Sequence, residues 1–381
     1  MALFEPDFFE PLTDEAWDEA RVRSAIEEIV ADADTVYDAR ELWPVTDEWD
    51  NWGSRMPLKH LYVGAAGVVW ALRELERRGH ASSKLDLAAA ARRALELWRA
   101  EPGVLTNLET PEPADASLLM GEAGILLVAW LTRPEDALAD RLHGLVLSNR
   151  DNEADELMWG APGTMVAARI MLNETGDRRW ADAWQDSAKA VRARREPEGF
   201  WPYTLYGSVY RGLGPAHGVV GNVAALLQGG RDEQLERETA GLLAQRAVHD
   251  DGAANWPNAV GDFRVQWCAG APGIITSAAA YLDEELVVAG AEVARRSGPA
   301  NMEKGSGICH GTASQGYAFL TAFVRTGDER WLDDARRFAV HALGQIKRRG
   351  RARYSLWTGD VGVALYASDC LDATARYPFL P

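Results

Sequence analysis

Hydrophobic and polar positions along the chain define two kinds of helical segment. In the first kind, apolar and charged residues fall on opposite faces, as in KLDLAAAARRALELWRA, RWADAWQDSAKAVRARR and RWLDDARRFAVHALGQI. This spacing predicts amphipathic helices with one buried face. In the second kind, almost every residue is apolar, which is typical of helices that are buried on most sides. No long stretch alternates strictly between apolar and polar residues, so strand signals are scarce.

A glycine motif precedes each of the apolar segments. Six of the seven copies read G-x-x-G, and the sixth copy along the chain has Ser314 in place of the second glycine. The first glycines are separated by between 39 residues (Gly121 to Gly160) and 58 residues (Gly160 to Gly218). A unit of this length has room for two helices and their connections. The seven first glycines are Gly64, Gly121, Gly160, Gly218, Gly270, Gly311 and Gly359.

The repeat predicts an all-α fold in which each unit contributes one inner apolar helix and one outer amphipathic helix. Units stacked in a line would give a solenoid, and units that close would give a ring. We favour an (α/α) toroid of about seven inner and seven outer helices, because the inner helices then converge on one centre. Residues 51–381 are assigned to this single toroid, and residues 1–50 to an N-terminal extension that supplies an outer helix. This extension, residues 1–50 with the stretch DEWDNWGSRMP (residues 47–57) at its end, is a candidate substrate lid and equally a candidate for ordinary outer packing.

Composition narrows the class of protein without naming a substrate. The chain is 47% apolar and 25% charged, as expected of a globular protein, and its net charge is −17. This charge argues against nucleic acid or an anionic membrane as the main partner. The first residues lack the features of a signal peptide, and the apolar runs are shorter than the roughly 20 residues of a membrane span. We therefore expect a cytoplasmic protein.

The repeats differ most in the residues directly before their glycines. Cys268 precedes the fifth motif, Cys309 and His310 precede the sixth, and His217 precedes the fourth. If equivalent positions of a ring face one centre, these four side chains meet there. Two thiolates and one imidazole suit zinc, and three protein ligands leave the open position that is typical of a catalytic site. Three cysteines in a cytoplasmic chain argue against a disulfide framework, and Cys370 is expected in the core.

These motifs resemble the lanthionine synthetase C-like family over nearly the whole chain. The most specific stretches are WCAGAPG around Cys268, CHG around Cys309 and AHG around His217. The C-terminal SLWTGDVGVALYASDCLDATARYPFLP is more similar to the eukaryotic-type branch. The resemblance implies a toroid around one zinc ion held by Cys268, Cys309 and His310. It also implies a proton donor and acceptor at His217.

Three further charged positions follow from the same resemblance. Arg264 matches an arginine of the lantibiotic cyclases, Glu156 matches an acidic position, and Lys304 matches a lysine linked to glutathione in the eukaryotic-type branch. Two positions depart from the family pattern: Ala269 stands where many members have an aromatic residue or histidine, and Thr358 stands where an acidic residue is usual.

The implied reaction is conjugate addition of a thiol, from a peptide cysteine or glutathione, to dehydroalanine or dehydrobutyrine. Zinc would deprotonate the thiol, His217 would protonate the carbanion, and Arg264 would stabilise the enolate oxygen. Glu156 would orient either His217 or Arg264. The chain shows no dehydratase region, so a separate dehydratase or kinase would have to prepare the dehydrated peptide or protein.

Two other interpretations remain open at this point. One is a non-catalytic scaffold that keeps zinc and binds glutathione or a peptide without turnover. The other is a glycoside hydrolase on an (α/α) barrel, with Glu156 and Asp262 as paired carboxylates and tryptophans as platforms. The hydrolase interpretation leaves the cysteine and histidine motifs unexplained. We expect the tryptophans before the motifs, Trp159, Trp267 and Trp357, to be packing residues.

Overall fold

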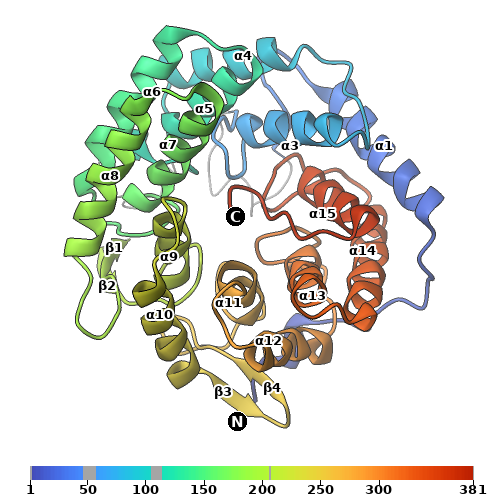
Figure 1. Ribbon diagram of the computed structural model, residues 1–381. Coiled ribbons are helices and arrows are strands. Elements are labelled where there is room, and N and C mark those ends of the chain that lie inside the picture. The colour runs from blue at the N-terminus through green and yellow to red at the C-terminus, as the bar shows by residue number, and fades with distance from the viewer. Residues whose placement is uncertain (1, 46–56, 104–113, 206, 381) are drawn as a thin grey trace.

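The computed structural model describes residues 2–45, 57–103, 114–205 and 207–380. The helices of these residues form a closed ring of two concentric layers (Figure 1). This arrangement confirms the predicted all-α toroid. The inner layer consists of α3 (Ala65–Arg77), α5 (Glu122–Thr132), α7 (Ala161–Thr175), α9 (Val219–Leu227), α11 (Ala271–Ala278), α13 (Thr312–Thr326) and α15 (Asp360–Asp372). The outer layer consists of α1 (Glu19–Val36), α4 (Leu87–Ala100), α6 (Asp136–Ser148), α8 (Arg178–Ala193), α10 (Glu233–Arg246), α12 (Glu284–Ser297) and α14 (Glu329–Arg349).

The two layers begin their helices in different ways. Five outer helices begin after an aspartate whose side chain accepts a hydrogen bond from a backbone N–H of the first turn, namely Asp18, Asp86, Asp177, Asp232 and Asp328. The inner helices instead begin at the repeat glycines. A Cβ atom at Gly124 would lie 2.0 Å from the Leu118 carbonyl oxygen and 2.9 Å from Cβ of Leu61 in the neighbouring unit. The glycine therefore permits an approach that any side chain would block.

The sixth repeat replaces its second glycine without losing this close packing. Ser314 is fully buried, and its hydroxyl donates a hydrogen bond of 2.7 Å to the carbonyl of Gly311. The tight contact is moved to Gly316, where a Cβ atom would lie 1.9 Å from the Tyr366 hydroxyl of α15.

A ladder of backbone hydrogen bonds joins the loops that precede the inner helices. Each bond runs from a residue just before one glycine motif to a residue just before the motif of a neighbouring unit, and together the bonds link the fifth, sixth, seventh, first and second units. The bonds are Trp267 N–H to Cys309 C=O (2.9 Å), Cys309 N–H to Trp357 C=O (2.8 Å), Trp357 N–H to Tyr62 C=O (3.3 Å) and Tyr62 N–H to Leu119 C=O (2.9 Å).

The N-terminal helix completes the outer layer. Helix α1 packs against α15, so the first helix of the chain is the outer partner of the last inner helix (Figure 1). Residues before α1 run back along the ring, where Glu10 N–H donates to the carbonyl of Pro299 and Asn301 N–H donates to that of Phe8, both at 2.9 Å. The boundary predicted near residue 50, and residues 47–56 of the candidate lid, lie outside the described residues.

The C-terminal residues enter the centre of the ring (Figure 1). Tyr377 stacks on Trp267 with ring centroids 4.8 Å apart, and its hydroxyl donates to the Ile308 carbonyl at 2.8 Å. Trp267 and Trp357 are 1% exposed, as their expected packing role requires. No helix in the described part of the chain has the length and apolar character needed to cross a membrane.

Two short hairpins depart from the sequence expectation. Strand β1 (Tyr203–Leu205) pairs with β2 (Ser208–Tyr210), and β3 (Val248–Asp250) pairs with β4 (Ala253–Asn255), both antiparallel. Strands of three residues are too short to show an alternating pattern, which explains why the sequence did not predict them.

A matched pair of glycine substitutions tests the role of the motif glycines. We expect Gly124→Ala to lower the free energy of unfolding by about 2–3 kcal/mol or more, because the new methyl group would collide with backbone. Gly144→Ala, in the next helix α6, meets nothing within 4 Å and should raise stability by up to about 1 kcal/mol. Urea unfolding of both variants measures the two effects. Equal stabilities would contradict the packing argument.

Candidate functional site

Three side chains predicted as metal ligands lie together at the centre of the ring lining. Cys268 comes from the loop before α11, and Cys309 and His310 come from the loop before α13. One ligand atom from each of these residues lies within 4.8 Å of the other two. Two sulfurs and an imidazole at this separation form a group able to hold one metal ion. We call these three residues the Cys-Cys-His cluster.

The backbone around the cluster explains how two loops can meet so closely. Trp267 N–H and Cys268 N–H both donate to the Cys309 carbonyl, at 2.9 and 3.3 Å. Directly after Cys268 the chain turns into α11 through Gly270, whose φ is +104°, a value that favours glycine. A Cβ atom at Gly270 would also lie 1.8 Å from the Arg264 carbonyl oxygen. The cysteine therefore sits on a turn that only glycine allows.

Two polar side chains donate hydrogen bonds to the sulfurs of the cluster. Gln266 Nε2 lies 2.8 Å from Cys268 Sγ, and the Tyr62 hydroxyl lies 3.0 Å from Cys309 Sγ. Such donors orient thiolate ligands and tune their basicity. Neither Gln266 nor Tyr62 was predicted from the sequence. Gln266 had a local signal, since it lies two residues before Cys268, whereas Tyr62 is 247 residues from Cys309 in sequence.

The two thiols of the cluster titrate as a pair. A hydrogen bond from Cys309, with His310 nearby, lowers the pKa of Cys268 well below its ordinary value. Burial and the neighbouring Cys268 raise the pKa of Cys309. The first sulfur is thus stabilised as a thiolate by the proton that the second retains. A divalent cation would replace that shared proton, which is the chemistry expected of a metal-binding dithiol.

His217 and Glu156 form a second group beside the cluster. His217 Nδ1 lies 2.5 Å from Glu156 Oε2, and Glu156 also accepts from the N–H groups of Trp159 (2.6 Å) and Met158 (3.1 Å). Burial favours the neutral imidazole, but the charge and hydrogen bond of Glu156 outweigh it and raise the pKa of His217. Because Nδ1 is engaged by Glu156, Nε2 is the nitrogen that remains for a substrate. Of the two partners considered for Glu156, the structure shows His217.

Arg264 and Lys304 lie together at another edge of the cluster. The Arg264 guanidinium carbon lies 5.5 Å and Lys304 Nζ lies 4.6 Å from the centre of the Phe8 ring. Burial and the charge of Arg264 lower the pKa of Lys304, while Cys268 acts in the opposite direction. Arg264 also pairs with Asp262 at 3.1 Å. Phe8, which lies in the N-terminal segment before α1, was not predicted from the sequence.

The structure also shows the surroundings of the two positions that depart from the family pattern and of the two carboxylates considered for a glycoside hydrolase. Ala269 lines a cavity described below. Thr358 is buried, with its hydroxyl 2.6 Å from that of Ser355. Asp262 forms an ion pair with Arg264, and Glu156 forms one with His217. Each of the two carboxylates considered for a glycoside hydrolase is thus paired with a basic side chain of its own.

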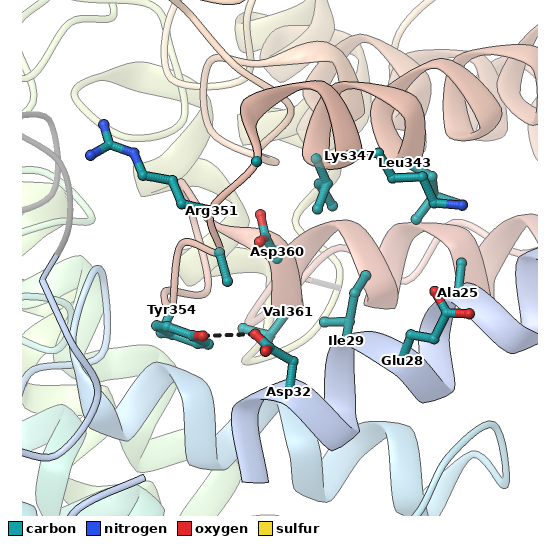
Figure 2. Close-up of a pocket in the computed structure, with 13 residues that line it drawn as sticks. Ala25, Glu28, Ile29, Asp32, Leu343, Lys347, Arg351, Tyr354, Asp360 and Val361 are labelled. Atoms are coloured by element: carbon teal, nitrogen blue, oxygen red, sulfur yellow. Dashed lines mark hydrogen bonds between the residues drawn. The ribbon is translucent and has the colours of Figure 1, made fainter. Parts of the chain in front are cut away.

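A cavity of about 250 Å³ connects the cluster with the His217 pair. Both Cys268 and His217 line it, together with residues of the β1–β2 hairpin and the loop of residues 257–260. A second cavity of about 390 Å³ lies between α1 and the α14–α15 connection (Figure 2). There the Tyr354 hydroxyl donates to Asp32 at 2.7 Å, and the walls carry charges of both signs. The second cavity has none of the predicted site residues in its walls.

Comparisons with known proteins agree with this architecture. A family model described as lanthionine synthetase C-like protein matches residues 54–381. The chain is 27% identical over 325 residues to glutathione S-transferase LANCL1 of Danio rerio, covering 74% of this chain and 78% of the relative. Its fold is similar to that of nisin cyclase, with a TM-score of 0.58, 16% identity, and coverage of 94% and 96% of the two chains. Since the family model spans well over half of the sequence, the chain belongs to the lanthionine synthetase C-like family.

Proposed function

We propose that the chain is a zinc-dependent enzyme that adds a thiol to dehydroalanine or dehydrobutyrine and so forms a thioether. The observation that carries this proposal is the cavity shared by Cys268 of the Cys-Cys-His cluster and by His217, which is half-buried and paired with the buried Glu156. The first group suits activation of a thiol, and the second suits delivery of a proton. The relatives bear the names of a cyclase and a glutathione S-transferase, which fit the same chemistry.

The metal would be held by Cys268, Cys309 and His310. The donor set is that of zinc sites, and the hydrogen bonds from Gln266 and Tyr62 supply the outer support that such ligands need. When bound, zinc supplies a Lewis acid that lowers the pKa of a thiol from its ordinary value of about 8.5.

Arg264 and Lys304 would bind the anionic groups of the thiol donor. Both cations lie against the Phe8 ring, and Lys304 is close enough to Cys268 for their charges to interact. Glutathione carries two carboxylates and fits this edge. A peptide cysteine followed by acidic residues has similar chemistry. The enolate role predicted for Arg264 from the sequence would use the same charge.

His217 would carry the proton in the second half of the reaction. The thiol sulfur bonds to the β-carbon of the dehydroamino acid, and the π electrons of the C=C bond move to the α-carbon and its carbonyl. His217 Nε2 then donates a proton to the α-carbon, and the proton released by the thiol restores the imidazolium. Glu156 holds Nδ1 and raises the pKa of His217, which favours the protonated ring. No net oxidation or reduction occurs.

Metal content is the first test. We expect about one zinc per chain in the purified protein, and its loss in Cys309→Ala, because two ligands do not hold the ion tightly. Cys370→Ala is the matched control, since Cys370 is a buried cysteine of α15 outside the cluster. Elemental analysis measures both. A wild-type protein free of zinc after preparation without chelators would overturn the zinc mechanism, and zinc without thiol addition would favour a binding scaffold.

The pH dependence tests the His217–Glu156 pair. Glu156 raises the pKa of His217, so the proton donor is present below that pKa and is lost as the pH rises through it. We expect Glu156→Gln to lower kcat by about 10- to 100-fold and to shift the falling alkaline limb of the pH–rate profile to lower pH. Glu122→Gln removes another buried carboxylate, paired with Arg141, and should leave the limb in place. An unshifted limb in Glu156→Gln would contradict the assignment.

The charge of the thiol donor tests Arg264 and Lys304. We expect Lys304→Ala and Arg264→Ala each to raise the KM for glutathione by about tenfold, the effect of losing one charged hydrogen-bond partner. In the same two variants, the KM for 2-mercaptoethanol, which has no carboxylate, should change by less than about twofold. Lys189→Ala, an exposed lysine on α8, is the control. Equal effects on both thiols would show that these cations do not bind the donor's carboxylates.

A further inference from the structure

We propose that the 250 Å³ cavity beside Cys268 and His217 binds an apolar side chain next to the dehydroamino acid of the acceptor peptide. This inference rests on the proposed function and adds a specificity site to it. The cavity is smaller than the roughly 300–1,000 Å³ of pockets that enclose a whole drug-sized ligand, so it fits part of a ligand such as one or two side chains.

The lining of the cavity is mostly apolar and comes from four segments of the chain. Tyr203 and Tyr210 of the β1–β2 hairpin line it, with their rings stacked at a centroid distance of 5.8 Å. Pro257 and Val260 come from the loop after β4. Small lining residues leave the volume open: Gly212, Gly214, Ala269 and Gly270.

The cavity carries an exposed hydrophobic side chain that a bound peptide would cover. Val260 lines the cavity and is 67% exposed, the highest value among the large hydrophobic side chains of the described residues. An exposed apolar group in the wall of a pocket is consistent with a binding site for an apolar partner.

The positions of the charged groups assign the cavity to the acceptor and not to the thiol donor. His217 lines the cavity and stacks against Tyr203, with ring centroids 6.0 Å apart. A proton from His217 can reach the acceptor's α-carbon only if the residues flanking that carbon lie in or beside this cavity. Arg264 and Lys304 do not line it, so a donor with carboxylates has its partners at a different edge of Cys268. The two substrates would then meet between these two edges.

Ala269 controls the volume of the cavity. It is half-buried, lies directly after Cys268 and lines the cavity. A phenylalanine at this position would occupy the space that we assign to the acceptor side chain. Ala269→Phe should therefore remove the preference for an apolar neighbour. Val260→Asp places a charge at an exposed lining residue and provides a second variant that does not disturb buried packing.

Binding of unreactive peptides tests the cavity apart from the reaction. Fluorescently labelled octapeptides would carry leucine, glycine or aspartate on both sides of an alanine that stands in for dehydroalanine. Fluorescence anisotropy gives the Kd for wild type, Ala269→Phe, Val260→Asp and Ala352→Phe. The last variant makes the same alanine-to-phenylalanine change in the other cavity (Figure 2). Zinc content of each variant shows whether the cluster is intact.

We expect wild type and Ala352→Phe to bind the leucine peptide about tenfold or more tightly than the glycine peptide, as burial of a leucine side chain predicts. In Ala269→Phe and Val260→Asp this ratio should fall to within about twofold. Equal binding of both peptides by wild type, or an undiminished ratio in both variants, would overturn the inference.

The same peptides with dehydroalanine and glutathione separate the two proposals. Mass spectrometry detects the thioether. The expected leucine preference in binding without any thioether would refute the proposed reaction and leave the cavity assignment standing. Thioether formation by wild type with no leucine preference in binding would refute the cavity assignment alone.

Discussion

The backbone ladder between the loops of neighbouring units is the constraint on which the site depends. The Cys309 carbonyl accepts from Trp267 and Cys268, and Cys309 N–H donates to the Trp357 carbonyl. These bonds fix the separation of the loops, and with it the separation of the side chains they carry. Glycines at the helix starts make the ladder possible, because a Cβ atom there would collide with backbone. The side chains of the Cys-Cys-His cluster are therefore positioned by hydrogen bonds of the main chain.

The polar and charged partners of the site fall into two groups. On one side, the two sulfurs receive hydrogen bonds from Gln266 and Tyr62. On another, Arg264 and Lys304 flank Phe8, where their charges are tolerated because the ring attracts both cations. In the proposed reaction, an anionic donor and an apolar acceptor would approach Cys268 from different sides. In a chain with a net charge of −17, this pair of cations is a local feature and does not reflect the overall composition.

The sequence predicted the features that repeat and missed those that do not. Seven glycine motifs were sufficient to predict the two layers of helices, and equivalent positions in adjacent units were sufficient to bring Cys268, Cys309 and His310 together. Phe8 and Tyr62 carry no motif and reach the site only because the ring closes. The partner of Glu156 was undetermined, since position relative to a glycine does not specify the direction of a side chain. The β1–β2 hairpin lines the cavity beside Cys268, and its three-residue strands are too short to show an alternating pattern in the sequence.

The partners of the buried carboxylates distinguish the proposed proton carrier from structural ion pairs. Glu122 pairs with Arg141, Asp155 with Arg194, Asp360 with Arg349, and Asp369 with Arg376. Arginine does not release a proton at any physiological pH, so these pairs only offset the cost of burying charge. Glu156 is as buried as they are, but its charged partner is a histidine that keeps 28% of its side-chain surface exposed. A histidine exchanges protons near neutral pH, so this pair alone among the five couples a buried charge to a transferable proton. In the proposed reaction, its place beside Cys268 would make the cavity a site for proton transfer as well as for binding.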